Sequence, residues 1–181
     1  VVDGVEYELL DTTFPTVDWD DPYRLTEDEA AVIEQLCAAF TGSERLQRHM
    51  RFFLDRGSLY KIENGNLMLH ACVPLADDGS LLEVTLFGKT YRGRALYDMV
   101  DASVRAAFSA TDEAERKRGL DMLWYLWLGP GSPLFAKSKM ATFELYLIAD
   151  KAARKEVKNP FYTLIEGERV IDRPVTIAGG E

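Results

Sequence analysis

The dipeptide Asn64-Gly65 narrows the possible fold more than any other feature of this sequence. It stands between two apolar-rich runs, residues 58–63 and 66–73. Both central positions of a two-residue hairpin turn need a positive φ, which asparagine and glycine adopt more easily than other residues. The sequence therefore predicts an antiparallel β-hairpin at this point, and Leu81–Phe87 is a candidate for a further strand.

Four segments show the spacing and the end signals of amphipathic helices. In the first, Thr26 is followed three residues later by Glu29, which is the spacing of a capping box. We expect Gly57 to end the second helix in the left-handed conformation and Thr111 to cap the fourth. The predicted helices run from Thr26 to Gly42, from Ser43 to Gly57, from Ala95 to Phe108 and from Asp112 to Leu128.

The remaining segments carry weaker signals. We expect short strands at Gly4–Leu10, Phe161–Ile165 and Val170–Ile177, and a surface loop over residues 11–23. Residues 140–148 form an apolar run that fits a strand or a helix. The fold class that follows is α+β.

The charge balance excludes some partners. The 181 residues hold 21 lysines and arginines against 30 aspartates and glutamates, a net charge of −9. A chain this acidic is poorly suited to nucleic-acid phosphates or anionic membranes, so neither is an expected partner. The two cysteines, Cys37 and Cys72, are too few for a disulfide framework, which favours a cytoplasmic location.

The two histidines differ in their surroundings. His49 lies on a predicted helix among charged and apolar neighbours, where a hydrogen bond on the helix surface or between helices is the simplest role. His70 ends an apolar strand, at a position where β-sandwich enzymes often place ligands. A single histidine does not build a metal site, because such a site needs three or more protein ligands.

Two basic segments are candidates for binding a phosphorylated small molecule. Residues 89–94 contain Lys89, Arg92 and Arg94. The second segment runs from Lys151 through Lys155 and Lys158 to Asn159-Pro160. For each segment a solvated connection is the alternative interpretation.

Two further patterns have structural interpretations. Asp55-Arg56-Gly57 resembles part of a dimetal phosphatase motif, but it follows an apolar helix end, so we interpret it as a helix C-terminus. The aromatic residues Trp124, Tyr125 and Trp127 are expected in the core.

Longer segments resemble, in order, those of one enzyme family. The most distinctive is Asn-Gly-Asn-Leu-Met-Leu-His-Ala-Cys-Val-Pro at residues 64–74. The others are Asp11–Pro15, Glu44–Met50, Gly88–Asp98, Asp121–Trp127 and Lys158–Tyr162. Through them the chain resembles the class III, or Firmicutes-type, fructose-1,6-bisphosphatases from about Gly4 to Tyr162.

The resemblance implies a calcineurin-like metallophosphoesterase. In that superfamily two divalent ions, typically manganese in this class, activate a water at the edge of a β-sandwich for attack on phosphorus. His70 occupies the slot of a metal-ligating histidine, although Ala71 follows it where glycine is more usual. Residues 58–87 would supply sandwich strands, and residues 88–160 a mainly helical insertion.

The substrate implied by the resemblance is fructose 1,6-bisphosphate, which the full-length enzyme converts to fructose 6-phosphate and phosphate in gluconeogenesis. The first candidates to contact a phosphate are Lys89, Arg92 and Arg94. Further candidates for substrate binding are Lys155, Lys158 and Asn159.

The superfamily's other metal-binding motifs do not occur in this sequence. We therefore expect residues 1–181 to be one region, an internal piece of a longer enzyme, that binds no metal and is inactive alone. Its exposed strand edges could support self-association. Two alternatives remain open, a non-catalytic binding or regulatory module and a relative that acts on another phosphorylated sugar.

Overall fold

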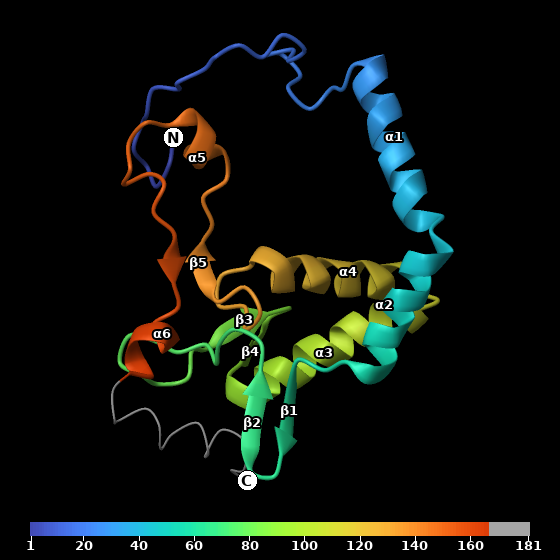
Figure 1. Cartoon of the computed structure of the whole chain (residues 1–181), viewed down its shortest axis with the longest axis vertical. Helices are drawn as coiled ribbons and strands as arrows, with labels where there is room; N and C mark the ends of the chain where they lie inside the picture. The colour runs from blue at the N-terminus through green and yellow to red at the C-terminus, as the bar shows by residue number, and fades with distance from the viewer. Residues whose placement is uncertain (167–181) are drawn as a thin grey trace.

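The structure is a computed structural model that describes residues 1–166, so the strand expected at Val170–Ile177 lies outside the described residues. Helices and small antiparallel sheets share the described part of the chain (Figure 1). The helices are α1 (Glu27–Thr41), α2 (Glu44–Arg56), α3 (Gly93–Ser109), α4 (Glu113–Leu128), α5 (Phe143–Leu147) and α6 (Phe161–Leu164). The strands are β1 (Tyr60–Glu63), β2 (Asn66–Leu69), β3 (Val84–Leu86), β4 (Lys89–Tyr91), β5 (Lys137–Lys139) and β6 (Val157–Lys158).

The main core lies between α3 and α4. Leu96 and Val100 of α3 meet Met122 and Leu126 of α4, with Val84 of β3 beside them. The two helices approach closely at Gly119, where an added Cβ would lie 2.3 Å from the Cβ of Ala107. A side chain at this position would therefore force the helices apart.

The capping signals are confirmed at the first two helices. At α1 the Thr26 N–H donates to Glu29 Oε2 at 2.8 Å, and the Glu29 N–H donates to Thr26 Oγ1 at 3.3 Å. At α2 the Leu46 N–H donates to Ser43 Oγ at 3.3 Å. The expected cap of α4 was wrong by one residue, because Asp112 Oδ1 accepts from the Glu115 N–H at 2.8 Å.

The first hairpin is confirmed, with Tyr60 opposite Leu69 and Glu63 opposite Asn66. Its turn residues Asn64 and Gly65 have φ values of 51° and 76°. A second hairpin, β3–β4, turns at Phe87 and Gly88 with the same two φ values, 51° and 76°. The sequence did not predict it, because phenylalanine rarely occupies a left-handed position.

Three local expectations were wrong. Residues 4–10 form isolated bridges, one of them between Leu9 and Ile148, rather than a strand. Residues 161–164 are helical, since the Asn159 side chain accepts from the Phe161 N–H at 3.0 Å and starts a turn. Gly57 ends α2 in an extended conformation, φ −81° and ψ 161°, where Arg105 Nη2 donates to its carbonyl at 2.8 Å.

The ambiguous run at residues 140–148 contains the short helix α5. The strands β5 and β6, which pair with each other, were not expected. Asp55 and Arg56 do end α2, as expected.

The aromatic cluster on α4 is only partly in the core. Trp124 and Trp127 are 66% and 69% exposed, which contradicts the expectation. Tyr125 is half-buried, and within the described residues its buried hydroxyl has no hydrogen-bond partner. No helix among the described residues is long and apolar enough to cross a membrane.

The sheets of the described part are each two-stranded: β1–β2, β3–β4 and β5–β6. A smaller apolar cluster around Val73 and Leu75 joins the end of the first hairpin to Phe161 and Leu164 of α6. This cluster ties the segment after His70 to the C-terminal part of the described chain.

Candidate functional site

His70 lies at the open end of the first hairpin. It directly follows Leu69, the β2 residue that pairs with Tyr60, and its side chain is exposed. The next residue, Ala71, has a φ of 72°, so the chain turns sharply there before it enters the buried segment Cys72–Leu75. The left-handed conformation explains why a glycine suits this position.

The basic segment 89–94 is a strand and the start of a helix rather than a loop. Arg92 forms an exposed ion pair with Glu83 at 3.4 Å, and Arg94 forms one with Asp98 at 3.3 Å. Lys89 has no ion-pair partner among the described residues. Exposed pairs of this kind stabilise a fold by about 1 kcal/mol or less, so the two arginines remain available to a ligand.

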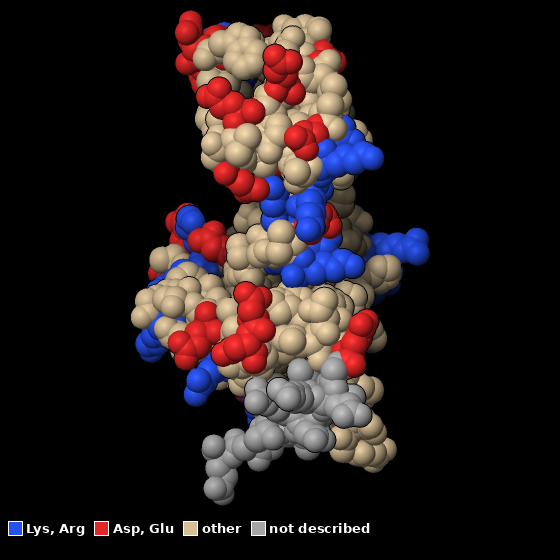
Figure 2. Space-filling model, turned by 90° about the vertical axis from the view of Figure 1, so that its left-hand side faces the viewer, with Lys and Arg blue, Asp and Glu red and all other residues tan. Residues whose placement is uncertain are grey.

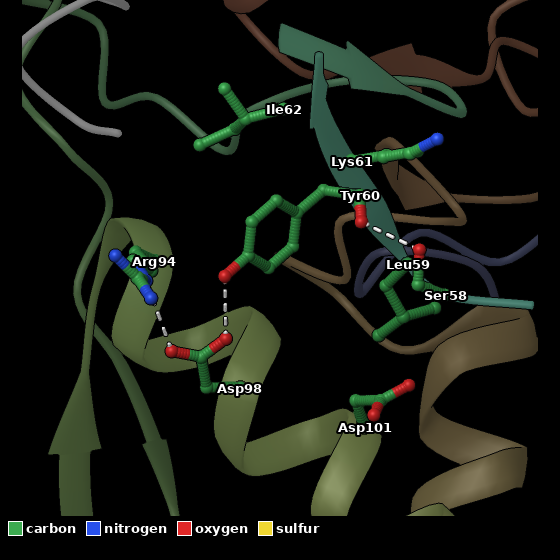
Figure 3. Close-up of a pocket in the computed structure, with 8 residues that line it drawn as sticks. All are labelled: Ser58, Leu59, Tyr60, Lys61, Ile62, Arg94, Asp98 and Asp101. Atoms are coloured by element: carbon green, nitrogen blue, oxygen red, sulfur yellow. Dashed lines mark hydrogen bonds and ion pairs between the residues drawn. The ribbon is translucent and has the colours of Figure 1, made fainter. Parts of the chain in front are cut away.

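Arg94 is the one predicted substrate residue that lines the cavity drawn in Figure 3. This cavity, of about 380 Å³, lies between β1 and the first turns of α3. Its lining comprises Ser58, Leu59, Tyr60, Lys61, Ile62, Arg94, Asp98 and Asp101.

Asp98 connects the two sides of this cavity. One carboxylate oxygen accepts from the Tyr60 hydroxyl at 2.8 Å, and the other accepts from Arg94 Nε at 3.3 Å (Figure 3). Burial, followed by the hydrogen bond to Asp98, raises the pKa of Tyr60. Tyr60 therefore stays protonated near neutral pH and keeps donating to Asp98.

Arg94 is the group of this lining best placed to receive an anion, although the lining also holds the carboxylates of Asp98 and Asp101. Because Asp98 engages Arg94 through Nε, the two terminal guanidinium nitrogens of Arg94 carry donors that this bond leaves free. A guanidinium fixed in this way matches the two oxygens of a phosphate group. Lys61 adds a second cation to the lining, although Glu63 pairs with it at 2.8 Å.

The second basic segment lies on another face. In Figure 2, lysine and arginine side chains gather in a band across the middle of the face that carries β5 and β6. Lys137 and Lys158 pair directly across these strands, and Lys137 also forms an ion pair with Glu156. Lys158 stands 6.0 Å from the centre of the Tyr162 ring, and Lys155 is exposed.

Asn159 is engaged within the fold. Its Oδ1 accepts from the Leu75 N–H at 3.1 Å, and its Nδ2 donates to the Leu75 carbonyl at 3.3 Å. These bonds place Asn159 beside the segment that follows His70. The structure thus brings Asn159 and the end of the His70 segment together, while Lys155 and Lys158 stay exposed.

The described residues do not fit a dimetal centre by themselves. Among residues 1–166 no group of three or more histidines, cysteines, aspartates or glutamates could hold a metal ion. His70 supplies at most one ligand.

The sequence comparisons decide the family. The family model described as Firmicute fructose-1,6-bisphosphatase matches residues 1–176. The chain belongs to this family. Curated relatives agree with the assignment. A class 3 fructose-1,6-bisphosphatase of Bacteroides fragilis is 48% identical over 174 residues, which are 96% of this chain and 26% of the relative.

Two other relatives of the same name show a similar sequence identity and a similar coverage. The Clostridium botulinum protein is 49% identical over 165 residues, 91% of this chain and 25% of the relative. The Clostridioides difficile protein is 47% identical over 171 residues, 94% of this chain and 26% of the relative. The chain thus spans about a quarter of the length of these relatives. No solved structure matches it.

Sequence reasoning missed Tyr60 and Asp98 as parts of the cavity. The spacing of Arg94 and Asp98, four residues apart on a predicted helix, is a signal for their ion pair. No comparable signal exists for Tyr60, which lies 38 residues from Asp98 and reaches it only through the fold.

Proposed function

We propose that this chain forms part of a fructose-1,6-bisphosphatase that hydrolyses fructose 1,6-bisphosphate to fructose 6-phosphate and phosphate. The observation that carries the proposal is the family match over residues 1–176, with 48% identity to a relative named as such an enzyme. The relatives are about four times as long, so the rest of the active site would come from outside the matched region.

We further propose that the complete enzyme is a cytoplasmic, manganese-dependent metallophosphoesterase, to whose β-sandwich the first hairpin contributes. The exposed position of His70 at the open end of this hairpin leaves its ring accessible to a metal held mainly by other ligands. Both cysteines are free thiols, which suits a reducing compartment.

For substrate binding, the geometry favours Arg94 over Arg92 and Lys89. Arg94 is oriented by Asp98 at the edge of a cavity large enough for a sugar phosphate, whereas Arg92 is paired on the open surface. A phosphate of the substrate would take the terminal donors of Arg94. Lys155 and Lys158, which are both exposed, are further candidates, and Asn159 would act indirectly by holding the segment after His70.

The experiment that tests the function is an exchange between relatives. In a chimeric enzyme, this chain replaces the matching 174 residues of the Bacteroides fragilis protein. With manganese present, we expect the chimera to release phosphate from fructose 1,6-bisphosphate and not from fructose 6-phosphate. We expect the isolated chain to release none under the same conditions.

A further inference from the structure

A continuous apolar surface on α1 is exposed. Val32, Ile33, Leu36 and Phe40 are 55%, 50%, 51% and 64% exposed, and Cys37 is exposed beside them. Their spacing puts these five residues, which we call the α1 face, on one side of the helix. Figure 1 shows α1 standing apart from the other helices, and none of its residues is buried.

A helix of this kind needs a partner. α1 is 15 residues long, a length at which a helix without packing is only marginally stable in water. Its acidic first turn and capping box help to start it but bury no apolar surface. Helices of this length usually gain their stability from packing of the apolar face. Within residues 1–166 no other segment covers the α1 face.

A surface of α2 at the C-terminal end of α1 is rich in arginine. Arg45, Arg48 and Arg51, which we call the arginine row, line an open groove of about 620 Å³ with one carboxylate, Glu44, beside them, and the groove reaches the end of α1 at Thr41 and Gly42. None of the three forms an ion pair with any described residue. Three unpaired cations in a chain of net charge −9 favour an acidic counterpart.

We propose that the α1 face and the arginine row together dock the part of a class 3 fructose-1,6-bisphosphatase polypeptide that this chain does not match. The matched 174 residues are only 26% of the Bacteroides fragilis relative, so about three quarters of it is available to cover this surface. The docking part presents an apolar patch bordered by carboxylates. The proposal rests on family membership and not on the proposed activity.

A second copy of this chain is the less suitable occupant. Each copy carries a net charge of −9, so two copies repel one another.

Cys37 provides a direct probe of the α1 face. It is the exposed cysteine of the chain, and the other one, Cys72, is buried. In the isolated chain we expect a maleimide to label Cys37 rapidly and Cys72 slowly. In the folded chimera, with labelled positions assigned by peptide mass mapping, labelling of Cys37 should slow by at least about tenfold.

Three results would overturn the proposal. One is an equal rate for Cys37 in the chimera and the isolated chain. Another is fast labelling of Cys72 in the chimera, which would mean that the chain does not fold against the remainder. The third is protection of Cys37 in the isolated chain that grows with protein concentration, which would assign the surface to a second copy.

A substitution gives an independent readout that does not depend on activity. Leu36→Glu with Phe40→Glu should leave the Tm of the isolated chain unchanged, because both side chains are already exposed there. The same pair should lower the Tm of the chimera by several degrees. The matched control is Tyr146→Glu, on α5 and 79% exposed, which should change neither Tm. Equal shifts for the pair in both proteins contradict the proposal.

Discussion

The side chain of Asn159 pairs with the backbone of Leu75 much as a neighbouring strand would. It accepts from the Leu75 N–H at 3.1 Å and donates to the Leu75 carbonyl at 3.3 Å. Leu75 is only 5% exposed and belongs to the apolar cluster that joins the hairpin end to α6. The pairing fixes the path of the chain just after His70.

Loss of the Asn159 side chain should therefore destabilise the fold. Asn159→Ala leaves the two backbone groups of Leu75 without this partner, and we expect the free energy of unfolding to fall by about 2–3 kcal/mol in urea denaturation. The control is Asn66→Ala, because the Asn66 amide makes one exposed bond within the hairpin. An Asn159→Ala protein as stable as the control would show that the pairing contributes little.

Ala71 should be replaceable by glycine with a gain in stability. Its φ of 72° costs an alanine about 1–2 kcal/mol, and the extra chain entropy of glycine offsets about half of that. We expect Ala71→Gly to raise the free energy of unfolding by about 0.5–1 kcal/mol. The same exchange at Ala102, an exposed position inside α3, should lower it by about 1 kcal/mol. A loss at both positions would contradict the strain at Ala71.

The stability of the fold should depend on the hydroxyl group of one tyrosine, Tyr97, and not on that of another, Tyr125. The Tyr97 hydroxyl donates to the buried Cys72 carbonyl at 2.6 Å, so Tyr97→Phe should cost about 1–2 kcal/mol. The buried Tyr125 hydroxyl has no partner among the described residues, and burial raises the pKa of Tyr125 to about 12. Tyr125→Phe should therefore leave stability unchanged or raise it by up to about 1 kcal/mol. Thermal unfolding of both variants checks the contrast, and equal losses would contradict it.

Arg94 should contribute to binding of the substrate phosphate in the chimera. Arg94→Ala removes the oriented guanidinium, and we expect the KM for fructose 1,6-bisphosphate to rise by about tenfold. Arg92→Ala, which removes an equal charge from the open surface, should change the KM by less than about twofold. Arg94→Lys should restore part of the loss, since it returns the charge without the fork of donors. Equal effects of the two alanine variants would remove Arg94 from the site.

The sequence predicted those elements whose signals are local. The Thr26–Glu29 capping box and the Asn64-Gly65 turn depend on residues within a few positions of each other, and both are confirmed. The turn at Phe87-Gly88 was missed because the fold imposes a left-handed conformation on a phenylalanine there. Trp124 and Trp127 belong to an apolar run of the sequence, yet their side chains are exposed. An apolar pattern shows that a side chain favours burial but does not show whether another element packs against it.

The candidate site was predictable only in part. His70 and Arg94 stand in segments that resemble a known family, and this resemblance made them candidate site residues. Tyr60 reaches Asp98 across 38 residues of sequence, a contact that only the packing of β1 against α3 creates. The structural role of Asn159 likewise depends on a partner 84 residues away.

The central claim is that this chain forms part of a fructose-1,6-bisphosphatase. Phosphate release by the chimera tests this claim most directly. With manganese and fructose 1,6-bisphosphate, the chimera should work within about tenfold of the Bacteroides fragilis enzyme, a loss of no more than about 1.4 kcal/mol in transition-state stabilisation. His70→Ala in the chimera should abolish most of this turnover and reduce the bound metal, while His49→Ala should leave both unchanged. A folded chimera that binds the metal but releases no phosphate from fructose 1,6-bisphosphate would contradict the claim.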